Sequence, residues 1–462
     1  MPLLLLAAAA GLLTTGCRTY QEQNRVIQYW HRGDLPNAVV EAGKMAGKNA
    51  NNKDAVIWRL EQGAVLRANG QYADSNQAFD TAQEKMDGYA QKAKVRLGQE
   101  TGALLSNQAN LAYEGRSYDG IMLNTYMALN YLALGEPDKA RPELIRAYQR
   151  QQDAVQDNQK RIEKVQKEAA ENKDSAAIQR AQDDPALQAK IQTAAANLDN
   201  LKPYAAYVNP FTVYLDGLFF MADAADNSDL ERARKSFERV TAFAPGNRYV
   251  KQDLAMVDGL LNSRPLAPTT FVIFETGCAP VRDQVRIDIP IIVTRVSYIG
   301  AAFPILRLQD NFIPGLTVVA GGTDMPTSLV SDMDSVIGLD FKNEMPIVIT
   351  KTIAAAVVKG VAAYAANEAV GQQNDVAGLF MQIGTAVYQA AVNIADERTW
   401  TTLPKQFQVC QFPTPPDRKI ELETPGSGQT LPVTIGDGTI NLIYVKSINA
   451  NSPLLVSQMK LK

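Results

Sequence analysis

The stretch AVIWRLEQGAVLRANGQYADSNQAFDTAQEK, residues 55–85, decides the architecture of the first half of the chain. Its apolar residues recur three and four positions apart on both sides of a central glycine, which predicts two amphipathic helices joined by a short turn. A small residue at Gly63 lets the two helices approach closely, and Gly70 can adopt the left-handed backbone conformation that ends the first helix. Tyr72 and Phe79 are expected to fill the space between them.

Related hairpins lie before and after this one. The preceding turn is at Gly33, 37 residues before Gly70, and later hairpins turn at Gly135 and close at Pro245. This spacing is close to the 34-residue period of tetratricopeptide repeats, a pattern that residues 55–85 also match. Because one amphipathic hairpin cannot bury its apolar face alone, such units stack. We therefore predict a TPR-like α-solenoid over residues 17–262; the alternative is an irregular helical bundle.

Residues 150–200 interrupt the repeats with a polar, charged stretch in which apolar residues are sparse. Asp184 and Pro185 form a good helix start, because an N-cap acid precedes proline at the first helical position. Asp183 and Asp184 are accordingly read as capping residues. We predict a protruding, charged helical hairpin, and a partly disordered insert is the alternative.

The helical pattern of apolar residues ends at SRPLAP, residues 263–268. From 266 to 462, segments such as TTFVIFETG and VRIDIPIIV are rich in β-branched residues and predict strands. Two Ala-rich segments, residues 349–370 and 375–395, predict a packed helix pair against the sheet. Charged and amide residues interrupt the first, and neither reaches the roughly 20 apolar residues that a membrane span needs. The predicted fold is multidomain α+β: the solenoid, then a β-rich α+β domain.

Composition argues against several classes of function. The chain has 462 residues, a formal net charge of −3 and a pI of about 5.6, and no basic block of the kind that nucleic-acid binders carry. His31 is the only histidine, and the three cysteines form no CxxC pair. We find no P-loop, GxGxxG, GxSxG or HExxH motif. The chain is therefore predicted not to be an enzyme and to need no metal or cofactor.

The first residues, MPLLLLAAAAGLLTTGC, resemble a bacterial lipobox. An uncharged apolar run of 11 residues from Leu3 to Leu13 is the size of a secretory signal and too short to span a bilayer. Small polar residues then precede Cys17, which is expected to be lipidated and to become the mature N-terminus after removal of residues 1–16. The alternatives are an ordinary signal peptide, or an apolar helix with a chance cysteine.

Cys278 and Cys410 remain once Cys17 is set aside as lipidated. Both lie in or beside predicted strands of a protein expected in an oxidising compartment, so they are a candidate disulfide. Buried free cysteines are the open alternative, because sequence fixes neither the register nor the facing of the two strands.

Four segments together resemble a family of uncharacterised bacterial tetratricopeptide lipoproteins. They are EGRSYDGIMLNTYMALNYLALGEPDKARPEL (114–144), NPFTVYLDGLFF (209–220), FVIFETGCAPVR (271–282) and ADERTWTTLPKQFQVCQF (395–412). The matching residues are Glu114, Gly115, Tyr131, Gly135, Asn209, Pro210, Glu275, Gly277, Pro280, Asp396, Arg398, Trp400, Leu403 and Pro404. The resemblance covers most of the mature chain except residues 150–200. It implies lipidation, repeats and an envelope location, and it supplies no catalytic residue.

The late motif residues are read as structural. Trp400 is expected to fill the core, and Arg398 to pair with a neighbouring carboxylate such as Asp396 or Glu397. The predicted function is a protein–protein interaction scaffold, lipid-anchored to the outer membrane and facing the periplasm, with an envelope protein as partner. The alternatives are an accessory or activator lipoprotein of peptidoglycan synthesis and a structural subunit of an export or surface assembly. A glycan hydrolase that uses only carboxylates is the least favoured.

Replacing Cys17 by alanine tests the anchor. The Cys17→Ala chain should lose acyl labelling and move from the membrane fraction to the soluble periplasm, because the acyl chains on Cys17 are the only evident anchor. Metabolic labelling with a fatty-acid analogue and cell fractionation measure both effects. An unchanged membrane fraction would contradict the lipoprotein interpretation.

Overall fold

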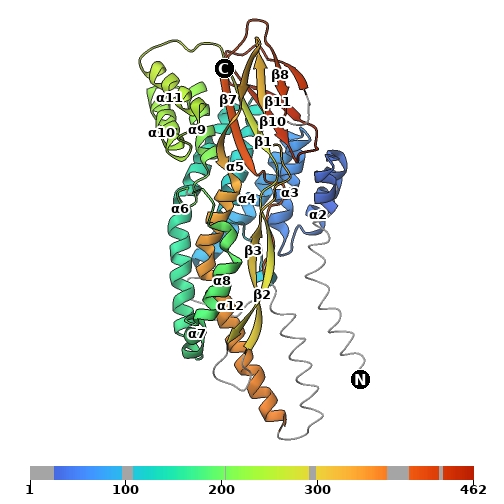
Figure 1. Ribbon diagram of the computed structural model, residues 1–462, viewed down its shortest axis with the longest axis vertical. Helices are drawn as coiled ribbons and strands as arrows, with labels where there is room; N and C mark the ends of the chain where they lie inside the picture. Colours follow the sequence, from blue (N-terminus) through green and yellow to red (C-terminus); the bar gives the residue numbers. More distant parts are fainter. Residues whose placement is uncertain (1–24, 96–107, 203, 291–297, 372–394, 426–429) are drawn as a thin grey trace.

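The structure is a computed structural model that describes residues 25–95, 108–202, 204–290, 298–371, 395–425 and 430–462. Helices occupy the first part of the described chain and strands predominate after residue 268, so the mixed α+β class is confirmed. Figure 1 shows an elongated molecule with the largest sheet and most of the helices at one end. Cys17 and the apolar leader lie outside the described residues.

Antiparallel hairpins make up the helical part. The helices are α2 (Leu35–Lys48), α3 (Ala55–Ala68), α4 (Tyr72–Val95), α5 (Ser117–Ala133), α6 (Pro137–Ala170), α9 (Pro210–Ala222), α10 (Asn227–Phe243) and α11 (Arg248–Leu261). Gly33, Gly70 and Gly135 sit at the turns before α2, α4 and α6 with φ angles of 70°, 76° and 72°. Glycine adopts this left-handed conformation without steric cost, so the three predicted turns are confirmed.

Close approach of paired helices depends on a glycine facing a phenylalanine. The Cα of Gly63 in α3 lies so near the ring of Phe79 in α4 that a β-carbon would overlap it. In the α9–α10 hairpin, a β-carbon on Gly217 would lie 3.0 Å from the ring of Phe237. Both phenylalanines are fully buried. The predicted role of Gly63 is therefore confirmed, and the same device recurs in a second hairpin.

A five-stranded sheet forms the centre of the second part, in the order β11-β10-β1-β7-β6. The strands are β1 (Thr269–Thr276), β6 (Ser328–Asp332), β7 (Gln406–Pro413), β10 (Ile440–Ser447) and β11 (Leu455–Lys460). The central strand β1 pairs in parallel with β10 and antiparallel with β7. Every residue of β1 and β10 is buried, as is typical of strands covered on both faces.

Two smaller sheets complete the strands. β2 (Val281–Pro290) and β3 (Tyr298–Arg307) form a long antiparallel ribbon. A four-stranded sheet has the order β5-β4-β8-β9, with β4 (Thr317–Ala320), β5 (Thr323–Pro326), β8 (Lys419–Glu423) and β9 (Thr430–Thr434). Its edge strands contain Pro326 and Pro432. Because proline has no N–H to donate, these edges resist pairing with another strand.

The polar stretch over residues 150–200 is helical, as predicted, but it does not stand alone. The lower half of α6, α7 (Ser175–Gln182) and α8 (Pro185–Ala194) pack against α12 (Met333–Gly371) and the β2–β3 ribbon, and together they form a narrow extension that we call the stem (Figure 1). The sparse apolar residues explain this packing: Val165, Ile178 and Leu187 are buried in a second hydrophobic cluster with Ile287 and Phe303.

The first Ala-rich segment lies within α12, and the segment at 375–395 falls almost entirely outside the described residues. Ile353, Ala354 and Val357 of α12 are buried in the stem cluster, so this segment packs against strand β3 as predicted, and the helices that it contacts are α6 and α7. Among the described helices, none is long and apolar enough to cross a bilayer.

One continuous hydrophobic core extends across the change from helices to strands. Helix gives way to strand between Leu261 and Thr269, which matches the predicted position of the change. Helical residues such as Phe211 nevertheless pack directly on the sheet, where its ring stacks on that of Phe407 in β7 at a centroid distance of 3.7 Å. The largest sheet and the hairpins therefore bury their apolar surfaces against each other.

The candidate disulfide between Cys278 and Cys410 is not formed: both are buried free thiols. Cys410 on β7 faces Val272 on β1, whereas Cys278 follows the end of β1, six residues beyond Val272. At about 3.3 Å of rise per residue, the stretch of β1 from Val272 to its end at Thr276 already spans about 13 Å. Bonded β-carbons lie about 4 Å apart, so the bridge would require a different strand register.

Two glycine substitutions with opposite expected effects on the free energy of unfolding test the packing of the hairpin formed by α3 and α4. Gly63→Ala should destabilise the protein by about 1–3 kcal/mol, because the methyl group overlaps a buried ring. Gly88→Ala, in the middle of α4 with open space around it, should instead stabilise by up to about 1 kcal/mol. Urea unfolding measures both values. Equal effects at the two positions would show that Gly63 is not a contact residue.

Candidate functional site

The late motif lies in an irregular segment at residues 396–405, here called the seam, which runs along the helices and leads into β7. The ring of Trp400 is fully buried and makes edge-on contacts with Phe79 and Tyr126, at centroid distances of 5.7 and 5.9 Å. Its predicted role as a core residue is confirmed. Leu403 and Pro404 are also buried, and the carbonyl of Leu403 accepts a hydrogen bond from the backbone of Ala279.

Arg398 forms the predicted pair and a second, longer-range one. Its Nε lies 2.7 Å from Oδ1 of Asp396, and its Nη1 lies 3.0 Å from Oδ1 of Asp54 at the start of α3. Nη1 also donates to the carbonyl of Leu111 at 2.9 Å. Burial opposes ionisation of Asp396, but the adjacent Arg398 holds the pKa of this carboxyl below its ordinary value. The ion pair between Arg398 and Asp54 thus attaches the seam to the start of α3.

The residue that accepts hydrogen bonds from the rest of the seam was not predicted. Glu61 of α3, which is almost fully buried, accepts hydrogen bonds from the backbone N–H of Thr401 at 2.6 Å and from the hydroxyl groups of Thr401 and Thr402 at 2.6 and 2.7 Å. Burial raises the pKa of Glu61 to about 6, although these donors favour its charged form. A glutamate on the apolar face of a predicted helix was the available signal.

A second buried ion cluster joins α5, β2 and α12. Arg116 and Arg282 contact Glu344 at 2.7 and 2.6 Å. Burial alone would raise the pKa of Glu344, but the two guanidinium groups hold it far below the ordinary range. Arg116 also lies 3.8 Å from Asp396, so this cluster continues into the seam.

Glu275, another motif residue, anchors β1 to its neighbours. The hydroxyl of Tyr126 donates to its carboxylate at 2.9 Å, and the Tyr444 hydroxyl and Lys446 ammonium of β10 also contact it. The ammonium of Lys446 in turn lies 4.9 Å from the ring of Trp30. Glu275 is 1% exposed, and the cation beside it keeps its pKa below the ordinary value despite burial.

These clusters explain what the motif residues do. The carboxylates of Glu275 and Asp396 are occupied by guanidinium, ammonium or hydroxyl groups, and these contacts help to hold the helices and sheets together. No group of three metal-ligating side chains occurs within the described ranges. Asp184 acts as the predicted N-cap of α8, because its carboxylate accepts from the backbone N–H of Leu187 at 2.7 Å. Glu275, Asp396, Arg398 and Trp400 are thus engaged in contacts between elements, and an open binding site is sought elsewhere.

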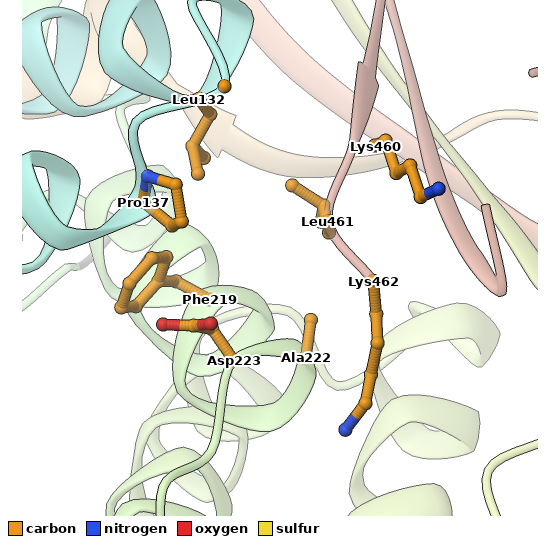
Figure 2. A pocket seen from close by; sticks show the side chains of 9 residues that line it. Leu132, Pro137, Phe219, Ala222, Asp223, Lys460, Leu461 and Lys462 are labelled. Atoms are coloured by element: carbon orange, nitrogen blue, oxygen red, sulfur yellow. The ribbon is translucent and has the colours of Figure 1, made fainter.

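An open pocket lies where two hairpin turns meet the end of β11 (Figure 2). Its volume is about 350 Å³. It is lined by Leu132, Gly135 and Pro137 of the α5–α6 turn, Phe219, Ala222 and Asp223 at the end of α9, and Lys460, Leu461 and Lys462. The side chains of Leu132, Pro137 and Phe219 face Leu461 across the opening (Figure 2). The walls are thus mainly apolar.

Charged groups lie at the mouth of this pocket. Asp223 is held by Arg141, whose Nη2 donates to the Asp223 carbonyl at 3.0 Å, and Lys460 lies 3.4 Å from Asp437. Lys462 makes no ion pair within the described part of the chain. An apolar side chain flanked by a carboxylate would match these walls and this rim. The pocket could not be predicted from the sequence, because its walls come from three segments far apart in the chain.

Comparisons with protein-family models, curated proteins and solved structures give no match to this chain.

Removing the Arg398 guanidinium tests the seam. Arg398→Met leaves the carboxylates of Asp54 and Asp396 buried without their main cation, so it should destabilise the protein by about 3–5 kcal/mol. The matched control is Arg234→Met, which removes an arginine with two carboxylate partners on the surface of α10 and should cause no measurable change. Urea unfolding compares the two. Similar stabilities would show that the seam is not held by Arg398.

Proposed function

We propose that this protein is a lipid-anchored scaffold that faces the periplasm from the bacterial outer membrane and binds another envelope protein. The observation that carries the proposal is the open, mainly apolar pocket formed by two hairpin turns and the end of β11. It is an accessible cavity, and its walls include none of the residues of the buried ion clusters. Binding, and no catalysis, is the role proposed for it.

The arrangement of the hairpins supports repeats of the tetratricopeptide kind. Successive hairpins contact each other through α4 with α5 and α6 with α9, so an apolar face is buried between units. Left-handed glycines at Gly33, Gly70 and Gly135 end corresponding helices. The same kind of contact, a helix glycine packed against a phenylalanine ring of the next helix, occurs at Gly63–Phe79 and at Gly217–Phe237. The resemblance of the motif segments to repeat-bearing bacterial lipoproteins adds the envelope location.

The chemistry of the pocket favours a peptide over a small metabolite. Small-molecule sites of about 300–1,000 Å³ combine apolar walls with several convergent polar groups. This pocket lies at the lower end of that range, and the carboxylate of Asp223 at its rim is engaged by Arg141. One or two apolar side chains of a partner segment fit such a slot better than a polar substrate does. The Lys462 ammonium at the rim favours an acidic residue beside the inserted side chain.

A photo-crosslinking amino acid at Leu134 tests this docking site in intact cells. Leu134 is 41% exposed and immediately precedes Gly135 in the pocket wall, so a bound partner should be captured there. The same amino acid at Val155, 49% exposed and lower on α6, is the position control. We expect a defined adduct, identified by mass spectrometry, from Leu134 and not from Val155.

A blocking substitution shows whether the adduct depends on the pocket. Leu461→Asp places a charge on the apolar wall and should reduce capture at Leu134 at least tenfold, whereas Val155→Asp should leave it unchanged. If both positions capture the same proteins, or if Leu461→Asp has no effect, the pocket is not the docking site.

A further inference from the structure

The first helical hairpin carries a basic outer surface. It consists of a helix at residues 25–31 and α2, and we define its basic face as Arg25, Arg32, Val40, Lys44 and Lys48, all exposed. Val40, Lys44 and Lys48 are spaced four residues apart, so they form one line along α2. Val40 is 68% exposed, more than any other large hydrophobic residue described as exposed. An apolar side chain therefore lies in a row of cations.

The carboxylates of this hairpin are less exposed than its cations. The side chain of Glu41 is 13% exposed, and it lies 3.9 Å from Arg25 and 3.8 Å from Lys44, whose side chains are 67% and 63% exposed. Asp34 caps α2 and accepts from the Asn37 side chain at 2.7 Å. The hairpin has four Lys and Arg against two acids, whereas the whole chain has a net charge of −3. Its outer surface is therefore positive.

The predicted anchor keeps this surface close to the bilayer. Cys17 precedes Arg25 by eight residues. A fully extended chain spans at most about 3.5 Å per residue, so these two residues are at most about 28 Å apart in any conformation. A 14-residue helix such as α2 is itself about 21 Å long. If Cys17 is acylated, the hairpin is the first described element along the chain from the membrane.

We propose that the basic face of residues 25–48 lies against an anionic lipid surface. Arg and Lys side chains contact the lipid phosphates, and Val40 enters the boundary between headgroups and acyl chains. The proposal rests on the lipid anchor of the proposed function. Each cation near an anionic bilayer raises partitioning by roughly fivefold, and a short tether keeps the surface at high effective concentration. Stable attachment commonly needs a lipid chain together with such a basic patch.

The exposed aliphatic residue favours lipid over an acidic protein. Amphipathic helices that lie in the membrane interface combine Lys and Arg with apolar residues that insert between the headgroups. A purely electrostatic protein contact would need no exposed Val40 in line with Lys44 and Lys48. The pocket is formed by other elements, α5, α6, α9 and β11, so the two surfaces can be occupied together.

Vesicle flotation with the Cys17→Ala chain tests the face without the acyl anchor. The chain should float with vesicles of phosphatidylglycerol and phosphatidylcholine, but not with phosphatidylcholine alone, and binding should fall as salt is raised. The triple variant R32E/K44E/K48E should bind at least tenfold more weakly. Val40→Ser should also weaken binding, although it leaves every charge unchanged, because it removes the apolar side chain that enters the bilayer.

The matched control reverses three exposed lysines on α8, α10 and α11, in the variant K190E/K235E/K251E. It makes the same change in net charge and should retain most of the binding, and circular dichroism verifies that all variants fold. Equal loss in both triple variants, or binding to neutral vesicles, would overturn the proposal. Loss of acyl labelling at Cys17 is measured separately, so failure of the anchor and failure of the face are distinguishable.

Discussion

The insertion of Trp400 between helices α4 and α5 is the contact on which the rest of the fold depends. Its ring completes an aromatic group with Phe79 and Tyr126, and the seam that carries it continues directly into β7. β7 then pairs with β1, the central strand of the largest sheet. The position of the indole ring among the helices therefore determines where the sheet lies against them.

Buried ion pairs fix how the helices and the largest sheet are placed against each other. Apolar contacts alone tolerate small shifts, because hydrophobic burial has no direction. Arg398 with Asp54, and Glu344 with its two arginines, can be satisfied in only one arrangement, since any shift leaves a charge buried without a partner. The helices, the seam and the stem are consequently held in one register by ion pairs whose members come from different elements.

Local patterns made much of this structure predictable. The glycine turns, the close contact at Gly63, the Asp184 cap, the Arg398–Asp396 pair and the change from helix to strand all depend on residues near each other in sequence. Contacts between distant segments could not be predicted. The parallel pairing of β1 with β10, the Glu61 acceptor, the pocket and the packing of the stem each join residues that are many tens of positions apart. The register of β1 against β7, which keeps Cys278 away from Cys410, could not be predicted for the same reason.

The parallel pairing of β1 with β10 has a consequence for the order in which the protein can mature. β10 is synthesised long after β1, and until it is made, Glu275 lacks Lys446 and β1 lacks one of its two neighbours. The helices that pack on this sheet, α5 and α9 among them, are made earlier, and the part of their surface that faces the sheet stays uncovered until the strands are complete. The sheet and the helices packed on it therefore cannot reach their final arrangement before β10 has been synthesised.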